Sequence, residues 1–487
     1  MPDILYRSAF TLARDIKAQR LSASEVLEFF LDRVERFNPG LNAVVAFDLE
    51  RARKRAKAAD AAAASGDDWG PLHGVPLTIK DAFCTEGLVT VGGIPECREN
   101  IPRANALAVQ KYVDAGAIIF GKTNVPLMSA DLQSYNEVYG TTNNPWNTDH
   151  TCGGSSGGAG AAVAAGLTPL ELGSDIGGSI RTPSHFNGVF GHKPSYGIVS
   201  QRGHLPPGEG TLSEADLSVV GPIGTSVDDL EQALDLLVGL NPEEAVAYRI
   251  ELPPAPKASL ANMRIAVWAD DDFCPVDSEI REAILRTGEA LAAAGASVDF
   301  EARPAINLED NLSNYGFMLS AAIGGGMPDA VFEAMKELSA ASDPADESFV
   351  MQQARGIAAH QRDWVRQMEK RQHLKAAWAA FFKDYDAVLC PCAFVTAFPH
   401  NQEGSQFERT LTVNGEQRPY LDILGWAGLT LNAELPATAV PVALSSEGLP
   451  IGVQVVADYL QDKTALAVAR QITAVLDFVP HPPGYEA

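Results

Sequence analysis

The sequence predicts a layered α/β domain, and three observations lead to that prediction. At 487 residues the chain is long enough to bury a large core. Its apolar fraction of 46% is ordinary for a globular protein. Short runs with strand character and helix character alternate along the chain, which is typical of helices packed against a sheet.

The first clear element is a helix that begins near residue 22. Ser22 and Glu25 have the spacing of a capping box, and Leu21 and Val26 can form a hydrophobic staple beside it. Apolar side chains then recur at helical spacing, at Val26, Phe29, Phe30, Val34 and Phe37. The Asn-Pro-Gly sequence at 38–40 predicts the end of this helix.

The later elements alternate between strands and helices. In chain order we expect strand 75–79, helix 104–116, strand 117–121, strand 167–172, strand 263–268, helix 278–295, and a final strand pair at 439–444 and 451–456. Between about 300 and 385 the sequence looks mainly helical.

Charge and hydropathy exclude several classes of partner. The formal net charge of −25 argues against nucleic acid, because a phosphate-binding surface needs clustered Lys and Arg. No stretch approaches the roughly 18 to 20 apolar residues of a membrane span. The N-terminal segment lacks the basic-then-apolar order of a signal peptide. We expect a protein of the cytoplasm that binds neither nucleic acid nor a membrane.

The sequence predicts no metal site and no cofactor. The six cysteines are sparse, and Cys390-Pro391-Cys392 has neither a zinc spacing nor a redox spacing. No group of His, Cys, Asp and Glu has the spacing of metal ligands. These cysteines are therefore expected to be plain thiols.

Two glycine-rich segments and one lysine carry the chemistry. Ser155 lies in Cys-Gly-Gly-Ser-Ser-Gly-Gly, and Ser179 in Gly-Ser-Asp-Ile-Gly-Gly-Ser-Ile-Arg. Glycines let backbone N–H groups approach a ligand closely and converge on a developing negative oxygen. A serine hydroxyl is a weak nucleophile and needs a base. Lys80 ends an apolar run, and burial there would favour its neutral, basic form.

Together these segments resemble the amidase signature family, whose hydrolases use a Ser–cis-Ser–Lys triad. The resemblance implies that Ser179 is the nucleophile and that Lys80 is the base. Ser155, held in a cis peptide bond with Gly154, would relay a proton between them. The N–H groups of Ile176, Gly177, Gly178 and Ser179 would form the oxyanion hole, and Ser129 and Gly154 would border the substrate.

The resemblance covers most of the chain and is most specific over residues 74–200. It implies one domain over 1–487, built as a single α/β/α sandwich around a large twisted mixed β-sheet. Residues from about 300 to 435 would line the substrate pocket. Aromatic side chains there hint at an apolar or aryl acyl group, although they could equally belong to the core: Tyr315, Phe317, Phe398 and Trp426, with Tyr135 upstream.

The implied activity is metal-free hydrolysis of a linear amide C–N bond by a monomer or homodimer. The substrate would be a small-molecule amide with a small or aryl/apolar acyl group, and carbamates (urethanes) or esters are also open.

Three alternatives use the same residues differently. Residues 153–157 fit G-x-S-x-G, the nucleophile elbow of α/β-hydrolases, with Ser155 as nucleophile, but this leaves Lys80 unexplained. The chain could be the amidase subunit of a tRNA-dependent amidotransferase, although residues 201–207 and 214–222 look like those of stand-alone bacterial amidases. Lys80 could also be a surface lysine paired with Asp81.

Overall fold

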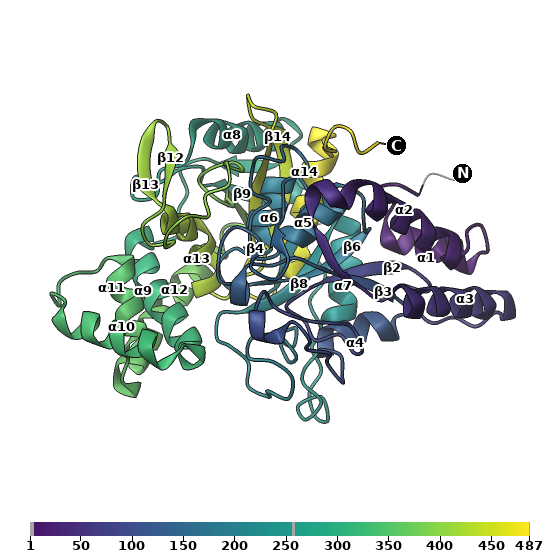
Figure 1. Ribbon diagram of the computed structural model, residues 1–487. Coiled ribbons are helices and arrows are strands. Elements are labelled where there is room, and N and C mark those ends of the chain that lie inside the picture. Colours follow the sequence, from purple (N-terminus) through teal and green to yellow (C-terminus); the bar gives the residue numbers. More distant parts are fainter. Residues whose placement is uncertain (1–3, 256–258, 487) are drawn as a thin grey trace.

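The computed structural model describes residues 4–255 and 259–486 (Figure 1), so the first residues of the N-terminal segment discussed above lie outside it. Its largest sheet has eight strands in the order β10-β9-β11-β15-β14-β7-β8-β6. Their bounds are β6 Leu170–Asp175, β7 Phe190–Lys193, β8 Val219–Gly224, β9 Arg264–Val267, β10 Ser297–Asp299, β11 Ala387–Pro391, β14 Ala437–Leu444 and β15 Pro450–Val456.

The large sheet is mixed. Strands β10, β9 and β11 run parallel to one another, and every neighbouring pair from β11 to β6 is antiparallel. The predicted C-terminal strand pair is confirmed as β14 and β15, which lie at the centre of the sheet.

Helices cover both faces of this sheet. Gln454 of β15 accepts a hydrogen bond from Arg181 of helix α6 (Arg181–Asn187), so its side chain points to the α6 face. Ala439 lies opposite Gln454 and shares that face, so Thr438 points the other way. Thr438 contacts His192, which in turn contacts Asp462 of helix α14 (Asp462–Leu476). Helices α6 and α14 therefore lie on opposite faces, and the predicted α/β/α sandwich is confirmed.

A smaller sheet of β1 (Val44–Phe47), β3 (Ile118–Thr123) and β2 (Pro76–Lys80) lies beside the large one (Figure 1). Strand β2 packs against β6 of the large sheet. The N–H of Thr78 donates to the Thr168 hydroxyl at 3.2 Å, just before β6 begins. The end of β2 meets the end of β6, where Lys80 Nζ lies 2.9 Å from Ser174 Oγ, just before the glycine-rich turn that follows β6. Two short hairpins complete the strands, β4 (Tyr135–Asn136) with β5 (Gly140–Thr141) and β12 (Thr410–Val413) with β13 (Glu416–Pro419).

The α-helices of the described residues are α1 Ala9–Lys17, α2 Ala23–Leu41, α3 Leu49–Ser65, α4 Leu107–Asp114, α5 Gly157–Ala164, α6 Arg181–Asn187, α7 Val227–Leu237, α8 Ser278–Ala293, α9 Leu308–Ile323, α10 Asp329–Ala341, α11 Phe349–Ile357, α12 Gln361–Phe381, α13 Leu424–Asn432 and α14 Asp462–Leu476. Apart from the end of the first predicted helix, the expected elements agree with the structure to within about three residues at each end. The expected helical stretch from about 300 to 385 is confirmed as α9 to α12.

Helix α2 confirms one sequence prediction and corrects another. Ser22 caps it in a full capping box with Glu25. The expected stop at 38–40 is wrong, because the helix runs through Pro39 to Leu41. Asn42 ends it instead, with a left-handed φ of 53°. The Asn38 side chain accepts the N–H groups of residues 43 and 44, which lets the helix pass directly into the next turn.

Candidate active site

Lys80 ends strand β2 inside the protein. The strand is buried along its whole length, and Lys80 Nζ lies 2.7 Å from Ser155 Oγ and 2.9 Å from Ser174 Oγ. Burial lowers the pKa of Lys80 from its ordinary 10.5 to about 7, against the opposing effect of the Asp175 and Glu171 carboxylates. A large fraction of this amine is therefore neutral near pH 7 and able to accept a proton.

Asp81 is not the partner of Lys80. Both side chains are fully buried, so the interpretation of a surface ion pair is wrong. The Asp81 carboxylate accepts hydrogen bonds from the backbone N–H groups of Val91 and Gly92, each at 3.1 Å. It thereby holds the loop that follows β2.

Ser155 lies in the glycine-rich turn before α5, directly after a cis Gly154–Ser155 peptide bond. The Ser134 hydroxyl braces the turn by donating to the Gly153 carbonyl at 3.0 Å and accepting from the Gly157 N–H at 3.1 Å. A Cβ on Gly154 would come within 2.5 Å of the Asp131 carbonyl oxygen. Only glycine fits at this close approach, and the packed turn directs the Ser155 hydroxyl toward Lys80.

Ser179 lies in the turn between β6 and α6, and 7% of its surface is exposed to solvent. The Ser156 N–H donates to the Ser179 carbonyl at 3.2 Å, so the two glycine-rich turns are joined directly. Within the described residues, no hydrogen bond joins the Ser155 and Ser179 hydroxyls. Such contacts are often long in a free site and shorten when substrate binds.

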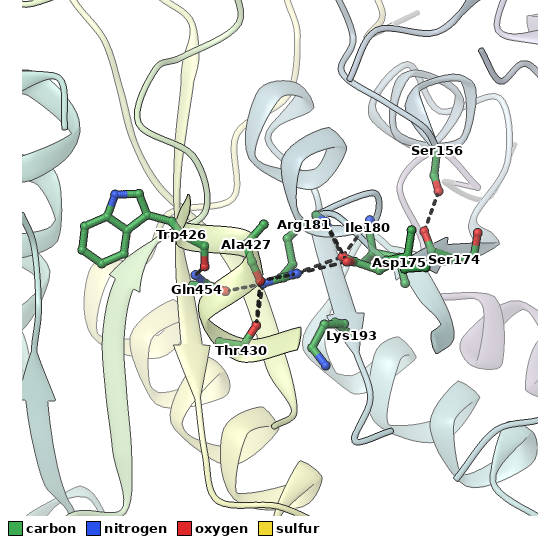
Figure 2. Close-up of polar contacts among 12 residues, drawn as sticks. Ser156, Ser174, Asp175, Ile180, Arg181, Lys193, Trp426, Ala427, Thr430 and Gln454 are labelled. Atoms are coloured by element: carbon green, nitrogen blue, oxygen red, sulfur yellow. Dashed lines mark hydrogen bonds and ion pairs between the residues drawn. The ribbon is translucent and has the colours of Figure 1, made fainter. Parts of the chain in front are cut away.

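A buried ion pair fixes the Ser179 turn (Figure 2). Arg181 contacts both carboxylate oxygens of Asp175, at 3.1 and 3.0 Å, and also donates to Gln454 and Thr430. Burial alone would raise the pKa of Asp175, but the Arg181 charge and the surrounding hydrogen bonds hold it below its usual value. Asp175 therefore stays ionised and anchors both ends of the turn.

The backbone N–H groups of the turn are not equivalent. The Gly178 N–H donates to the Asp175 carboxylate at 2.8 Å, as does the Ile180 N–H at 3.1 Å. In the described part of the chain, the N–H groups of Ile176, Gly177 and Ser179 have no acceptor of their own. Three of the four N–H groups expected from the sequence therefore remain available to an incoming oxygen.

Ser129 lies in a strained segment ahead of these turns. Met128 and Ser129 have φ values of 55° and 57°, a left-handed conformation that side-chain-bearing residues rarely adopt. The Ser129 hydroxyl oxygen is buried and has no hydrogen-bond partner within the described residues. The Met128 N–H donates to the Gly92 carbonyl at 2.9 Å, which ties this segment to the loop held by Asp81.

Sequence reasoning missed two side chains that contact the site, Ser174 and His204, and named a third, Tyr315, only as a candidate pocket aromatic. Ser174, the last residue but one of β6, lies between Lys80 and His204. The Tyr315 hydroxyl of α9 donates to the Ile176 carbonyl at 2.7 Å, at the start of the Ser179 turn. Ser174 belongs to the motif that also contains Ser179, but no local pattern marks His204 as a neighbour of Lys80.

Two of the other expected pocket aromatics, Trp426 and Phe398, pack against aromatic side chains. The Trp426 indole is fully buried against Trp268 and donates to the Cys274 carbonyl at 3.1 Å, so it belongs to the core. Phe398 packs edge-on against Phe186 and Tyr420. A hollow of about 510 Å³ lies among α9, α10, α11 and α12, but neither a serine of the two turns nor Lys80 lines it.

Two further features of the described residues bear on partners. No helix in residues 4–255 and 259–486 combines the length and apolar character needed to cross a membrane. In the same ranges, no three or more His, Cys, Asp or Glu side chains are grouped so that they could hold a metal ion. Independence from metals and cofactors stays a prediction.

The sandwich fold places a buried lysine against the serine of one glycine-rich turn, and a backbone hydrogen bond joins that turn to the second one. The family model for amidases matches residues 25–466. The chain therefore belongs to the amidase family, hydrolases that act on amide C–N bonds.

Two relatives match nearly the whole chain. A glutamyl-tRNA(Gln) amidotransferase subunit from Thermosynechococcus vestitus is 32% identical over 477 residues, which cover 94% of this chain and 95% of the relative. The indoleacetamide hydrolase of Bradyrhizobium diazoefficiens is 33% identical over 478 residues, 96% of this chain and 86% of the relative. The crystal structure of a bacterial aryl acylamidase of the amidase signature family has the same fold. Its TM-score is 0.82 at 24% identity, over 99% of this chain and 98% of that one.

Proposed function

We propose that residues 1–487 form one stand-alone amide hydrolase of the cytoplasm that works through an acyl-enzyme on Ser179. The observation that carries the proposal is the contact between the fully buried Lys80 amine and the Ser155 hydroxyl, beside the Ser179 turn. In this mechanism neutral Lys80 takes the proton of Ser155 while Ser155 takes that of Ser179. The freed Ser179 oxygen attacks the amide carbonyl.

Attack gives a tetrahedral intermediate whose oxygen becomes negative. We propose that the N–H groups of Ile176, Gly177 and Ser179 bind this oxygen, because the fourth expected donor, Gly178, already donates to Asp175. The leaving amine takes its proton from Ser155, which Lys80 resupplies. Water then attacks the acyl-enzyme while its proton passes through Ser155 to Lys80, and that proton returns to the Ser179 oxygen as the acid leaves.

We propose a small amide with an aryl or apolar acyl group as substrate, with carbamates and esters as further candidates. The Tyr315 ring is buried beside the Ser179 turn and supports this choice. Similarity to an indoleacetamide hydrolase, whose name implies an aryl side chain, supports it too. The unpartnered Ser129 hydroxyl and the backbone at Gly154 would contact the substrate, and residues from about 300 to 435 would complete the pocket.

The test is a panel of para-nitroanilides, aryl carbamates and short aliphatic amides, measured with wild type, Ser179→Ala and Ser155→Ala. We expect wild type to cleave aryl amides, and both variants to lose several orders of magnitude in kcat. Ser446→Ala, an exposed serine in a loop, is the control and should match wild type. Near-native turnover in Ser179→Ala with a dead Ser155→Ala would favour the nucleophile elbow instead.

A second candidate function is supported by the 32% identity to an amidotransferase subunit. In that role, the chain would depend on partner proteins for its function. The purified chain tested alone, by activity and by size-exclusion chromatography, separates the two. We expect full activity from a monomer or homodimer, whereas activity that appears only with added partner proteins would favour the amidotransferase role.

A further inference from the structure

A chain of hydrogen bonds continues from Lys80 away from the two catalytic serines. Ser174 Oγ lies 2.9 Å from Lys80 Nζ and 2.8 Å from His204 Nε2. The other ring nitrogen, His204 Nδ1, lies 3.2 Å from the Pro206 carbonyl oxygen. Ser174 comes from β6, while His204 comes from the long loop between β7 and β8.

The loop that carries His204 is fastened to the segment after β2. The Leu205 N–H donates to the Ala82 carbonyl at 2.7 Å, and residues 83 and 204 form an isolated β-bridge. The Phe83 ring meets the His204 ring edge-on at 5.1 Å. The imidazole is therefore held in place by contacts other than its own hydrogen bonds.

These contacts fix the direction of every proton in the chain. A carbonyl oxygen only accepts, so the His204 ring proton is on Nδ1, and Nε2 of the neutral ring is an acceptor. Ser174 has a single proton, which it must donate to Nε2. Its oxygen then accepts from Lys80. The neutral Lys80 amine gives one N–H to Ser174 and keeps its lone pair for the Ser155 hydroxyl.

We propose that His204 is a positioning residue which, through Ser174, reserves the lone pair of Lys80 for Ser155. This proposal rests on the proposed Ser179 mechanism. Without an acceptor at His204, the Ser174 hydroxyl is free to turn and donate to Lys80, where it competes with Ser155 for the same lone pair. The proton relay would then start from the wrong hydroxyl.

The electrostatic surroundings keep His204 in the required form. Burial, followed by the nearby Lys80 charge, lowers the pKa of His204 to about 4, so the ring is neutral at the pH of catalysis. The carboxyl groups of Asp175 and Glu171 lie close enough to raise the pKa of Lys80, and the amine of Lys122 lies close enough to lower the pKa of His204.

The kinetic test compares His204→Phe, Ser174→Ala and the double variant on one aryl amide. We expect His204→Phe to lose roughly tenfold in kcat with little change in KM, about the worth of one hydrogen bond. Since His204 acts through Ser174, the double variant should be no slower than Ser174→Ala alone. Losses that multiply in the double variant would overturn the proposal.

Two further variants separate positioning from structural support. His204→Gln offers a carbonyl oxygen that can accept from Ser174, and it should recover much of the lost kcat; no recovery relative to His204→Phe would count against the proposal. It also serves if His204→Phe fails to fold. His481→Phe is the control, because that ring stacks on Tyr6 near the other end of the chain, and it should behave as wild type.

One readout does not depend on activity. In an NMR spectrum of ¹⁵N-labelled protein, the ring signals of His204 are identified as those that disappear in the His204 variants. Near pH 7 these signals should be those of a neutral imidazole that is protonated on Nδ1. An Nε2-protonated or charged ring would overturn the assignment of proton directions, even in a fully active enzyme. If the His204 ring shows the expected tautomer but the protein has no amidase activity, only the proposed function is refuted.

Discussion

Replacing Lys80 by Met should abolish activity and at the same time stabilise the fold near pH 7. The pKa of the buried amine falls from 10.5 to about 7, so holding it in the folded protein costs about 4 kcal/mol at pH 7. Its contacts with the Ser155 and Ser174 hydroxyls return about 1 kcal/mol each. Met removes the cost and the contacts together, which leaves a net stabilisation of about 2 kcal/mol.

The sign of the pH dependence follows from proton binding. The unfolded amine keeps its proton up to its ordinary pKa of 10.5, whereas the folded amine loses it near 7. The unfolded state thus binds more protons between these values, and wild type gains stability as the pH rises through this window. Lys80→Met should lack this part of the gain. In wild type, kcat/KM should rise with pH through about 7, because neutral Lys80 is the active form.

The assay is a series of thermal unfolding midpoints and kcat/KM values between about pH 6 and pH 9. Lys193→Met is the matched control, because Lys193 is equally buried and burial lowers its pKa to about 7. Its amine donates to the Pro194 carbonyl, and within the described residues it makes no hydrogen bond to Ser155, Ser174 or Ser179. We expect this control to change the stability profile but to leave the pH dependence of kcat/KM as in wild type.

Two results would refute the reasoning about Lys80. A wild-type kcat/KM that stays flat through pH 7 would mean that the amine does not titrate in the active form. Substantial activity in Lys80→Arg would mean that this position supplies charge or structure, because a guanidinium stays charged and cannot accept the Ser155 proton.

Three further predictions concern the Ser179 turn and its independence from metals. Arg181→Met should destabilise the protein by about 3 to 5 kcal/mol, seen as a lower unfolding midpoint, because it leaves the Asp175 carboxylate buried without its charge partner. Gly178→Ala should lose most activity, because Gly178 has a φ of 92° and a Cβ there would lie 2.8 Å from the Thr182 hydroxyl. Gly177→Ala should keep the fold, because the nearest atom to a Cβ at that position is a flexible leucine methyl at 3.1 Å. EDTA should leave kcat unchanged, and a loss restored by a divalent cation would contradict this.

The parts of the site that the sequence could predict are those encoded over short distances. A glycine-rich turn around a serine, or a lysine at the end of an apolar run, can be recognised from a few consecutive residues. The structure brings Lys80 and Ser155 together, as those segments suggested. The capping box at Ser22 could be predicted for the same reason.

The remainder depends on contacts between distant segments. Strand β7 pairs with β14, more than 200 residues later, and no local pattern encodes that choice. His204 reaches Lys80 only because its loop fastens to the segment after β2. The helix end at Leu41 was mispredicted because Asn38 supplies side-chain acceptors that a Pro-Gly pattern does not reveal.

The most direct test of the central claim is to locate the nucleophile covalently. Wild type treated with a fluorophosphonate should carry one adduct, which peptide mapping by mass spectrometry should place on Ser179. Labelling should be strongly slowed in Lys80→Met, since Ser179 would then lack its base. An adduct on Ser155, or labelling of Ser179 at the wild-type rate without Lys80, would contradict the account.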